Sequence, residues 1–178
     1  MVAISKEYLP IISVIIPTCD RPTQFLQDAI ASARSQTLRP REVIVVDNGI
    51  RDVDMAALPD DVRYVRLPPR VGASRARNQG ALRAEGRLLA FLDDDDWWES
   101  EFLERLWARM DSDGARCGYG RKDVYEEGAV RPFKCPTPDT MTIAALLKRN
   151  PGVGGQNLLI ERDLYWQVGG FDEKLRLA

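Results

Sequence analysis

Histidine is absent from the chain, and only three cysteines occur among its 178 residues. Without histidine, the Ser-His and Cys-His pairs that activate nucleophiles are excluded, and acid–base chemistry is left to carboxylates. Cys19, Cys117 and Cys135 are odd in number and contain no C-x-x-C spacing. This pattern disfavours both a disulfide scaffold and a zinc site.

Long apolar runs and a charge imbalance are missing too. No stretch approaches the roughly 20 apolar residues that span a membrane, and residues 1–10 carry Lys6 and Glu7 instead of a continuous apolar core. The 25 lysines and arginines nearly balance the 27 aspartates and glutamates, so no net field favours nucleic acid. We therefore expect a cytoplasmic protein without a nucleic-acid partner, which could lie at the inner face of the membrane through other regions. The oligomeric state stays open.

The composition present is that of a globular protein, with 44% hydrophobic and 29% charged residues. A chain of this length can form one well-packed domain but not two ordinary ones, so we expect a single domain over residues 1–178. Short β-branched runs alternate with amphipathic helical patterns. This alternation predicts an α/β fold with an open, mostly parallel sheet flanked by helices.

The expected elements can be placed along the chain. Strands are predicted at residues 11–16, 43–46, 62–67, 87–92 and 157–160. Helices are predicted from Pro22 to before Pro40, from Ser74 as the N-cap to Ala84, and over residues 102–110, 142–148 and 162–168. Residues 118–124 and 130–134 are predicted to form a hairpin or an excursion from the sheet.

Four consecutive aspartates, Asp93 to Asp96, directly follow the predicted buried strand 87–92. Packing this much like charge costs free energy unless a cation is near, and Asp93 and Asp95 offer the oxygen ligands that Mg²⁺ or Mn²⁺ prefers. A solvated acidic turn that caps the next helix is the alternative interpretation. The position favours a metal site, because ligands of open α/β sheets bind beyond the carboxyl ends of the strands.

Further polar groups are expected near the same edge of the sheet. Asp47 and Asn48 could bind a nucleoside through hydrogen bonds, with an ordinary Asx turn as the alternative. Arg75 and Arg77 could bind phosphate, with solvated arginines at a helix start as the alternative.

An aromatic pair follows the aspartates. Trp97 and Trp98 could stack on a sugar ring, because an aromatic face suits the apolar side of a hexose. Such a pair more often divides between core and surface, and we expect at least one of the two rings to be structural.

Four segments occur in register along the chain: SVIIPTCDRP (13–22), SQTLRPREVIVVDNG (35–49), VGASRARNQGALRAEGRLLAFLDDDDWW (71–98) and VGGFDE (168–173). Together they resemble glycosyltransferase family 2, an inverting family with the glycosyltransferase-A fold. The resemblance covers the chain from Ile12 to its last residue and implies transfer of a sugar from a nucleotide diphosphate, usually UDP or dTDP. The acceptor would be a hydroxyl of a saccharide or lipid-linked molecule, attacked with inversion at the anomeric carbon.

The resemblance also implies roles for single residues. In that family the turns after the first and second strands hold the nucleoside, and an Asp-x-Asp motif holds a divalent ion. Asp95 would be the direct ligand of Mn²⁺ or Mg²⁺, supported by Asp93, with Asp93 or Asp94 toward the ribose. Such an ion would stabilise the charge that develops on the leaving nucleotide. The predicted nucleotide-binding residues are Pro17, Thr18, Asp20, Asp47, Asn48, Arg77, Asp93 and Asp94.

The chain departs from the family pattern in two places. Many members have Asp-Asp where this chain has Asp47 and Asn48, and often a tyrosine where Cys19 stands, which leaves the nucleobase open. The family's catalytic base lies in an acidic Glu-Asp motif shortly after the VGGFDE segment, so we expect it beyond Ala178. Asp172 and Glu173 are the nearby carboxylates, with loop capping as their alternative role.

Two rival functions follow from these departures. A non-catalytic module that binds a nucleotide or a protein partner is the main alternative, because a chain without the base would bind donor and metal but transfer sugar poorly. A sugar nucleotidyltransferase is disfavoured, since residues 18–22 contain no glycine where such enzymes have a Gly-rich phosphate loop.

Overall fold

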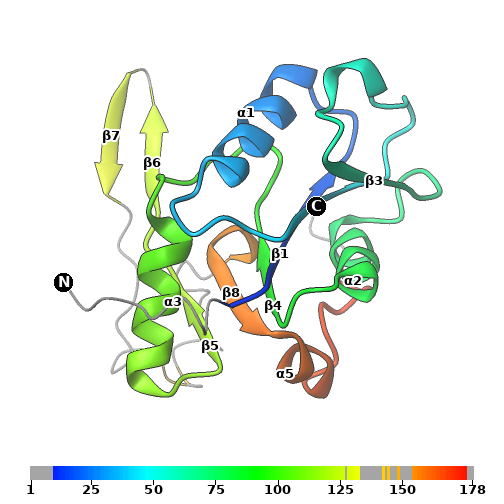
Figure 1. Cartoon of the computed structure of the whole chain (residues 1–178). Helices are drawn as coiled ribbons and strands as arrows, with labels where there is room; N and C mark the ends of the chain where they lie inside the picture. The colour runs from blue at the N-terminus through cyan, green and yellow to red at the C-terminus, as the bar shows by residue number, and fades with distance from the viewer. Residues whose placement is uncertain are drawn as a thin grey trace.

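A six-stranded sheet forms the centre of the protein in the computed structural model (Figure 1). The structure describes residues 10–126, 128–132, 142, 144, 148 and 154–175. Along the sheet the order is β3 (Val62–Arg66), β2 (Glu42–Asp47), β1 (Ile12–Thr18), β4 (Leu88–Phe91), β8 (Leu158–Glu161) and β5 (Cys117–Tyr119). The first four strands in this order run parallel, and β8 lies antiparallel to both β4 and β5. The predicted mostly parallel α/β sheet is confirmed, and β3 lies at one edge of it.

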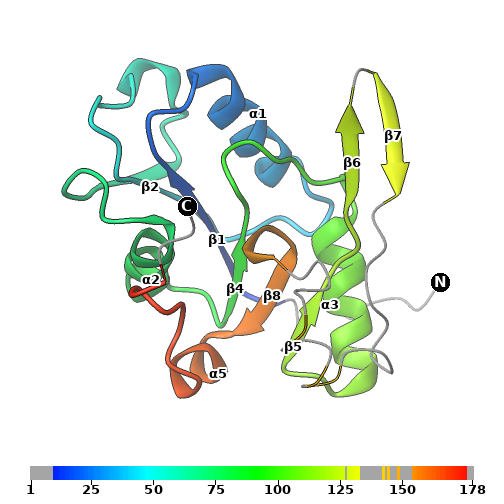
Figure 2. The same ribbon diagram turned by 180° about the vertical axis from the view of Figure 1, so that it is seen from behind.

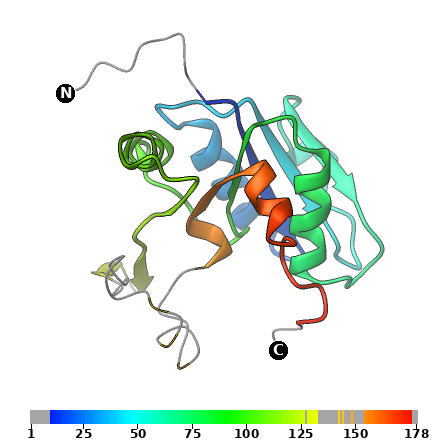
Figure 3. The same cartoon turned by 90° about the horizontal axis from the view of Figure 1, so that it is seen from below.

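Helices cover both faces of the sheet (Figure 3). On one face α1 (Thr23–Arg34) and α3 (Phe102–Asp113) pack against alternate residues of the central strands, among them Val14 and Val45. On the other face α2 (Ala73–Arg83) and α5 (Arg162–Gln167) pack against Ile15 and Ile44. Because successive side chains of a strand point to opposite faces, strands covered on both sides read as unbroken apolar runs. Every residue of β1 is buried for this reason.

The start of α2 differs from the predicted cap. Ser74 was expected to be the N-cap, but the helix begins at Ala73 and Gly72 precedes it without any side-chain cap. Gly72 has a φ of 94°, a backbone conformation that glycine adopts without steric cost. The chain therefore enters the helix two residues earlier than a cap at Ser74 would allow.

A two-stranded sheet of β6 (Asp123–Glu126) and β7 (Ala129–Pro132) stands apart from the central sheet (Figure 2). The predicted hairpin is therefore present, but its first strand begins later, because Gly118 belongs to β5. Within the described residues, short 3-10 helices lie at η2 (Met55–Ala57) and η4 (Gly155–Asn157). Of the predicted helix 142–148, only residues 142, 144 and 148 lie within the described part of the chain. No helix among the described residues is long and apolar enough to cross a bilayer.

Candidate functional site

The loops that follow three parallel strands meet at one edge of the sheet. β1 ends at Thr18, β2 at Asp47 and β4 at Phe91. Together with the first turns of α2, the segments that follow enclose a cleft of about 630 Å³, which we call the strand-end cleft. The cleft is lined by residues 17–21, Asn48, Arg70, 72–73, Arg77 and 93–95.

Asn48, in the loop after β2, joins that loop to the turn after β1 and to the start of α2. Its side-chain nitrogen donates a 2.9 Å hydrogen bond to the carbonyl of Thr18, and its side-chain oxygen accepts a 3.3 Å bond from the Gly72 amide. Its own backbone N–H donates a second bond to the Thr18 carbonyl. A buried amide with donors and an acceptor can satisfy all of these groups at once, so Asn48 positions the β1 turn against the start of α2.

Asp94 is the buried member of the acidic run. Its Oδ2 accepts a 2.6 Å hydrogen bond from the Thr18 hydroxyl, and its Oδ1 lies 3.6 Å from Nε of Arg21. Burial raises the pKa of the Asp94 carboxyl, and this effect outweighs the opposing contributions of Thr18 and Arg21. Asp94 therefore joins the loop after β4 to the end of β1.

Asp93 faces Arg77 from α2. The two side chains form a close ion pair and are both largely buried. The Arg77 guanidinium also lies over the ring of Phe171, 5.1 Å from its centroid, a favourable cation–π position. Among the described groups, Nε of Arg77 is buried without a hydrogen-bond partner. Arg77 thus places a fixed positive charge beside the acidic run.

Asp95 is the more open carboxylate, and Arg21 donates a 2.6 Å hydrogen bond to it. Within the described residues, no group of three or more His, Cys, Asp or Glu side chains is placed to hold a metal ion. A magnesium site of the kind completed by substrate phosphates needs only one or two carboxylates. Asp93 and Asp95 both line the strand-end cleft, and their oxygen atoms are the hard ligands that Mg²⁺ or Mn²⁺ prefers. These residues therefore fit a cation shared with a bound phosphate.

Asp96, the last residue of the run, faces a different cleft of about 960 Å³. Burial, together with the charges of Asp93 and Asp95, raises the pKa of Asp96 to about 6. The four aspartates therefore divide between two clefts, and Asp95 lines both of them.

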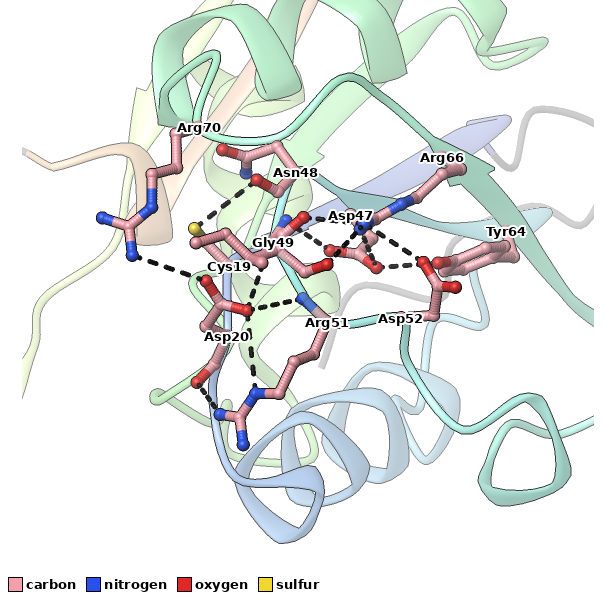
Figure 4. Close-up of polar contacts among 11 residues, drawn as sticks. Cys19, Asp20, Asp47, Asn48, Gly49, Arg51, Asp52, Tyr64, Arg66 and Arg70 are labelled. Carbon is pink, nitrogen blue, oxygen red and sulfur yellow. Dashed lines mark hydrogen bonds and ion pairs between the residues drawn. The ribbon is translucent and has the colours of Figure 1, made fainter.

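Asp47 turns toward β3 rather than into the strand-end cleft (Figure 4). Its Oδ2 accepts a 2.7 Å hydrogen bond from the Tyr64 hydroxyl and lies 2.6 Å from a terminal nitrogen of Arg66. Its Oδ1 accepts a 2.7 Å bond from the Gly49 amide. Burial, reinforced by the hydrogen bond to Asp47, raises the pKa of Tyr64 to about 12. A direct contact of Asp47 with a nucleoside stays a prediction.

Asp20 and Arg70 both line the cleft, and both have a positive φ, 54° and 55°. Asp20 Oδ1 accepts hydrogen bonds from the amides of Ile50 and Arg51, which lower the pKa of its carboxyl (Figure 4). Its Oδ2 lies 3.9 Å from a guanidinium nitrogen of Arg70. Non-glycine residues in this region are uncommon, and here the loop after β2 holds both of them.

Arg75 and the carboxylates near the end of the chain lie outside the strand-end cleft. Arg75 is 4.0 Å from Glu173, which also accepts a 2.9 Å hydrogen bond from Asn78. Asp172 accepts a 2.8 Å bond from the backbone of Lys174. Among the residues that the structure describes, Asp172 and Glu173 line neither cleft.

The two tryptophans divide as expected. Trp98 is buried, stacks on Phe102 with ring centroids 4.8 Å apart, and donates its indole N–H to the carbonyl of Gln156. Trp97 remains 54% exposed and meets Tyr125 of β6 edge to face, with centroids 5.7 Å apart.

Sequence reasoning missed Arg21, Tyr64, Arg66 and Arg70. The sequence signal for Tyr64 and Arg66 is the period of two in β3, which places both residues on one side of the strand. In the structure Arg66 pairs opposite Asp47. Arg21 and Arg70 lie in turns, where no periodic signal gives a side chain its direction.

The comparisons with known proteins agree with this architecture. A family model described as glycosyl transferase family 2 matches residues 13–169. TuaG of Bacillus subtilis, named as a glycosyltransferase of teichuronic acid biosynthesis, is 30% identical over 166 residues, covering 89% of this chain and 65% of the relative. Glycosyltransferase AglE of Haloferax volcanii is 27% identical over 176 residues, covering 94% and 58%. The succinoglycan biosynthesis protein ExoO of Rhizobium meliloti is 39% identical over 100 residues, covering 54% and 29%.

A solved structure has the same fold. The crystal structure of S. aureus TarS 1–349 matches with a TM-score of 0.68 and 22% identity, covering 94% of this chain and 52% of that one. The chain spans less than two thirds of the length of each of these relatives. Because the family model extends over nearly the whole described chain, from β1 to just past α5, the chain belongs to glycosyltransferase family 2.

Proposed function

We propose that the strand-end cleft is the donor site of a metal-dependent sugar transfer. The donor is a nucleotide-diphosphate sugar with UDP or dTDP as the nucleotide, and the acceptor is a hydroxyl of a saccharide or lipid-linked molecule, attacked with inversion. The names of TuaG and ExoO refer to teichuronic acid and succinoglycan biosynthesis. These names support a role in polysaccharide biosynthesis.

One observation carries the proposal: Asp93, Asp94 and Asp95 converge with the β1 turn and Asn48 on a single cleft. The nucleoside would lie between the turn 17–20 and Asn48, whose positions the Asn48 hydrogen bonds set. The diphosphate would lie toward Asp93 and Asp95. The nucleoside would thus lie at the loops after β1 and β2, and the diphosphate at the loop after β4, all at the same edge of the sheet.

Arginines in the cleft would compensate charge around the diphosphate. Arg77 is held by Asp93, and Arg21 by Asp95, so these two carboxylates of the acidic run are each already paired with a cation. Guanidinium groups bind phosphate oxygens in a bidentate manner. Arg21 is more exposed than Arg77. When a donor and metal bind, the Arg21 side chain would therefore be able to turn from the carboxylate of Asp95 to a phosphate.

Asp95 and Asp93 would hold the divalent ion, Mn²⁺ or Mg²⁺. A bound ion would supply stabilisation of the negative charge that develops on the leaving diphosphate. Asp172 and Glu173 contact Lys174 and Asn78 instead of a cleft, which favours the expectation that another residue supplies the base.

A calorimetric titration of UDP tests the donor site. We expect binding that requires Mn²⁺ or Mg²⁺, and at least about tenfold weaker binding in Asp95→Asn, because that variant removes a charged ligand of the cation. Asp163→Asn is the matched control, since Asp163 is an exposed carboxylate on α5. A parallel titration with dTDP distinguishes the two nucleotides.

Two results would contradict the proposal. If the affinity for nucleotide changes neither with the metal nor in Asp95→Asn, the proposal that a cation is bound at this site is wrong. No binding of either nucleotide would favour the interaction module over the enzyme.

A further inference from the structure

A second cleft opens next to the strand-end cleft, between the start of α3, the β6–β7 hairpin and η4. We call it the hairpin cleft. Its volume is about 960 Å³, near the upper end of the range of small-molecule sites, roughly 300–1,000 Å³. Its lining residues are 95–102, 105, 106, 109, 120–125, 130, 156 and 157.

The two clefts meet at Asp95, which lines both. A donor diphosphate beside Asp95 would place the sugar to be transferred at this shared wall. An acceptor has to approach the same point from the side that the nucleotide does not occupy, because reacting atoms come within about 3–3.5 Å. The hairpin cleft is the lined space on that side of Asp95.

Exposed aromatic and aliphatic groups form part of the hairpin cleft. Trp97 and Tyr125 are 54% and 57% exposed and stand nearly perpendicular to each other. Val124 and Val130 of the hairpin are exposed beside them. Aromatic faces left open to water in a cleft are suited to the apolar face of a pyranose ring.

The polar lining carries both signs of charge. The carboxylates include Asp96 and Asp123, and the cations include Arg105 and Arg121. A polyanionic ligand would meet repulsion from the carboxylates, and a purely apolar chain would leave the charged groups without water. A hydroxyl-rich ligand with one apolar face satisfies both parts of the lining.

We propose that the hairpin cleft binds the acceptor saccharide, with a pyranose ring placed against Trp97 and Tyr125. This inference rests on the proposed donor function of the strand-end cleft. Trp97 is the aromatic anchor, two residues beyond Asp95, and the β6–β7 hairpin is the outer wall. In this arrangement the loop after β4 serves both substrates: its aspartates face the donor, and its exposed tryptophan faces the acceptor.

Fluorine NMR of the full chain labelled with 5-fluorotryptophan tests the site directly. The chain contains four tryptophans, so each resonance can be assigned with one Trp→Phe variant. The probes are methyl β-glucopyranoside, methyl β-N-acetylglucosaminide and cellobiose, each titrated in the presence of UDP and Mn²⁺. We expect at least one probe to shift the Trp97 resonance saturably and to leave that of Trp166, an exposed residue of α5, unchanged.

Variants separate stacking from a general effect. Tyr125→Leu keeps apolar bulk on the hairpin but removes the ring, and we expect about five- to tenfold weaker saccharide binding, in line with typical aromatic contributions. Trp166→Ala, which removes an exposed aromatic ring that lines neither cleft, is the control and should leave the affinity unchanged. Tyr125→Leu should bind UDP with Mn²⁺ as the unaltered chain does.

The outcomes distinguish this inference from the donor proposal. Metal-dependent UDP binding without any probe-dependent shift at Trp97 would overturn the acceptor site and leave the donor site standing. Saccharide shifts at Trp97 in a chain that binds no nucleotide would support the saccharide site and overturn the donor function. A Trp97 resonance that responds only to protein concentration would identify the cleft as a contact between copies and overturn the inference.

Discussion

The Thr18 hydroxyl donates a 2.6 Å hydrogen bond to Oδ2 of Asp94, across 76 positions of sequence. The bond is buried and joins the carboxyl end of β1 to the acidic loop after β4. Because β1 and β4 are adjacent parallel strands, their following loops lie side by side, and this bond joins them together with the ion pairs of Arg21 to Asp94 and Asp95. The position of Asp94 determines where its neighbours Asp93 and Asp95 can point.

Replacing Thr18 with valine tests that contact. Thr18→Val keeps the shape but leaves a buried carboxylate without its donor, and we expect the free energy of unfolding to fall by about 1–3 kcal/mol. Thr18→Ser keeps the hydroxyl, and its free energy of unfolding should fall clearly less than that of Thr18→Val. Urea unfolding measures both, and equal losses in the two variants would show that the methyl group, not the hydrogen bond, stabilises the loop.

Arg75 and Arg77 form a matched pair for the second prediction, because they lie on the same helix but only Arg77 is largely buried. Arg77→Ala leaves the Asp93 carboxylate without its partner, and we expect a loss of about 2–4 kcal/mol in the free energy of unfolding. Arg75→Ala should change it by less than about 0.5 kcal/mol. Thermal and urea unfolding provide the measurement, and similar losses would contradict the assigned role of Arg77.

Arg77→Ala and Arg75→Ala should also differ in their affinity for UDP. Arg77→Ala is expected to weaken UDP binding at least about tenfold at a temperature where the variant is folded, since a cation beside the diphosphate is lost. Arg75→Ala should bind UDP normally. Equal affinities would place the diphosphate away from Arg77.

Burial of Tyr64, together with its hydrogen bond to Asp47, predicts a loss of stability at high pH. The pKa of Tyr64 is raised to about 12 in the folded chain, above its value of about 10 in an unfolded one. The stabilisation is therefore complete below pH 10 and is lost as the pH rises through 12. Tyr64→Phe should show a smaller decline in the free energy of unfolding over this range.

Tyrosine ring-carbon NMR provides a direct measurement of the same effect. Asp47→Asn should bring the pKa of Tyr64 down toward 10, because the negative charge that opposes phenolate formation is removed. The resonance of Tyr165, whose pKa is also raised to about 12 but mainly by burial, should not move. A Tyr64 pKa that is unchanged in Asp47→Asn would mean that the hydrogen bond does not control it.

The lowered pKa of Glu42 predicts a loss of stability at low pH. Burial alone would raise the pKa of Glu42, but hydrogen bonds from Ser13, the Glu85 amide and Arg63 outweigh it, so the folded pKa lies below the ordinary value. The stabilisation is present above the ordinary glutamate pKa and is lost as the pH falls through the folded one. Glu42→Gln should cost about 1–2 kcal/mol at pH 7, a difference that shrinks in acid. A constant difference between pH 7 and pH 3 would contradict this assignment.

Local pattern was sufficient for the frame of the protein. The apolar runs of β1, β2 and β4 are unbroken because both faces of these strands are buried. The polar turn after each run then has only one edge at which to lie. The division of Trp97 and Trp98 was also expected from the sequence, since such a pair more often divides between core and surface.

By itself, the sequence determined which segments would meet, and only the tertiary structure decided how their side chains are used. Arg77 rather than Arg75 reaches the acidic run, Asp47 turns to Tyr64 and Arg66, and Arg21 pairs with Asp95. Each of these choices depends on partners many residues away and on the direction of a side chain in a turn. Periodicity describes the residues within one strand or helix, so it carries no information about which distant charge a turn will face.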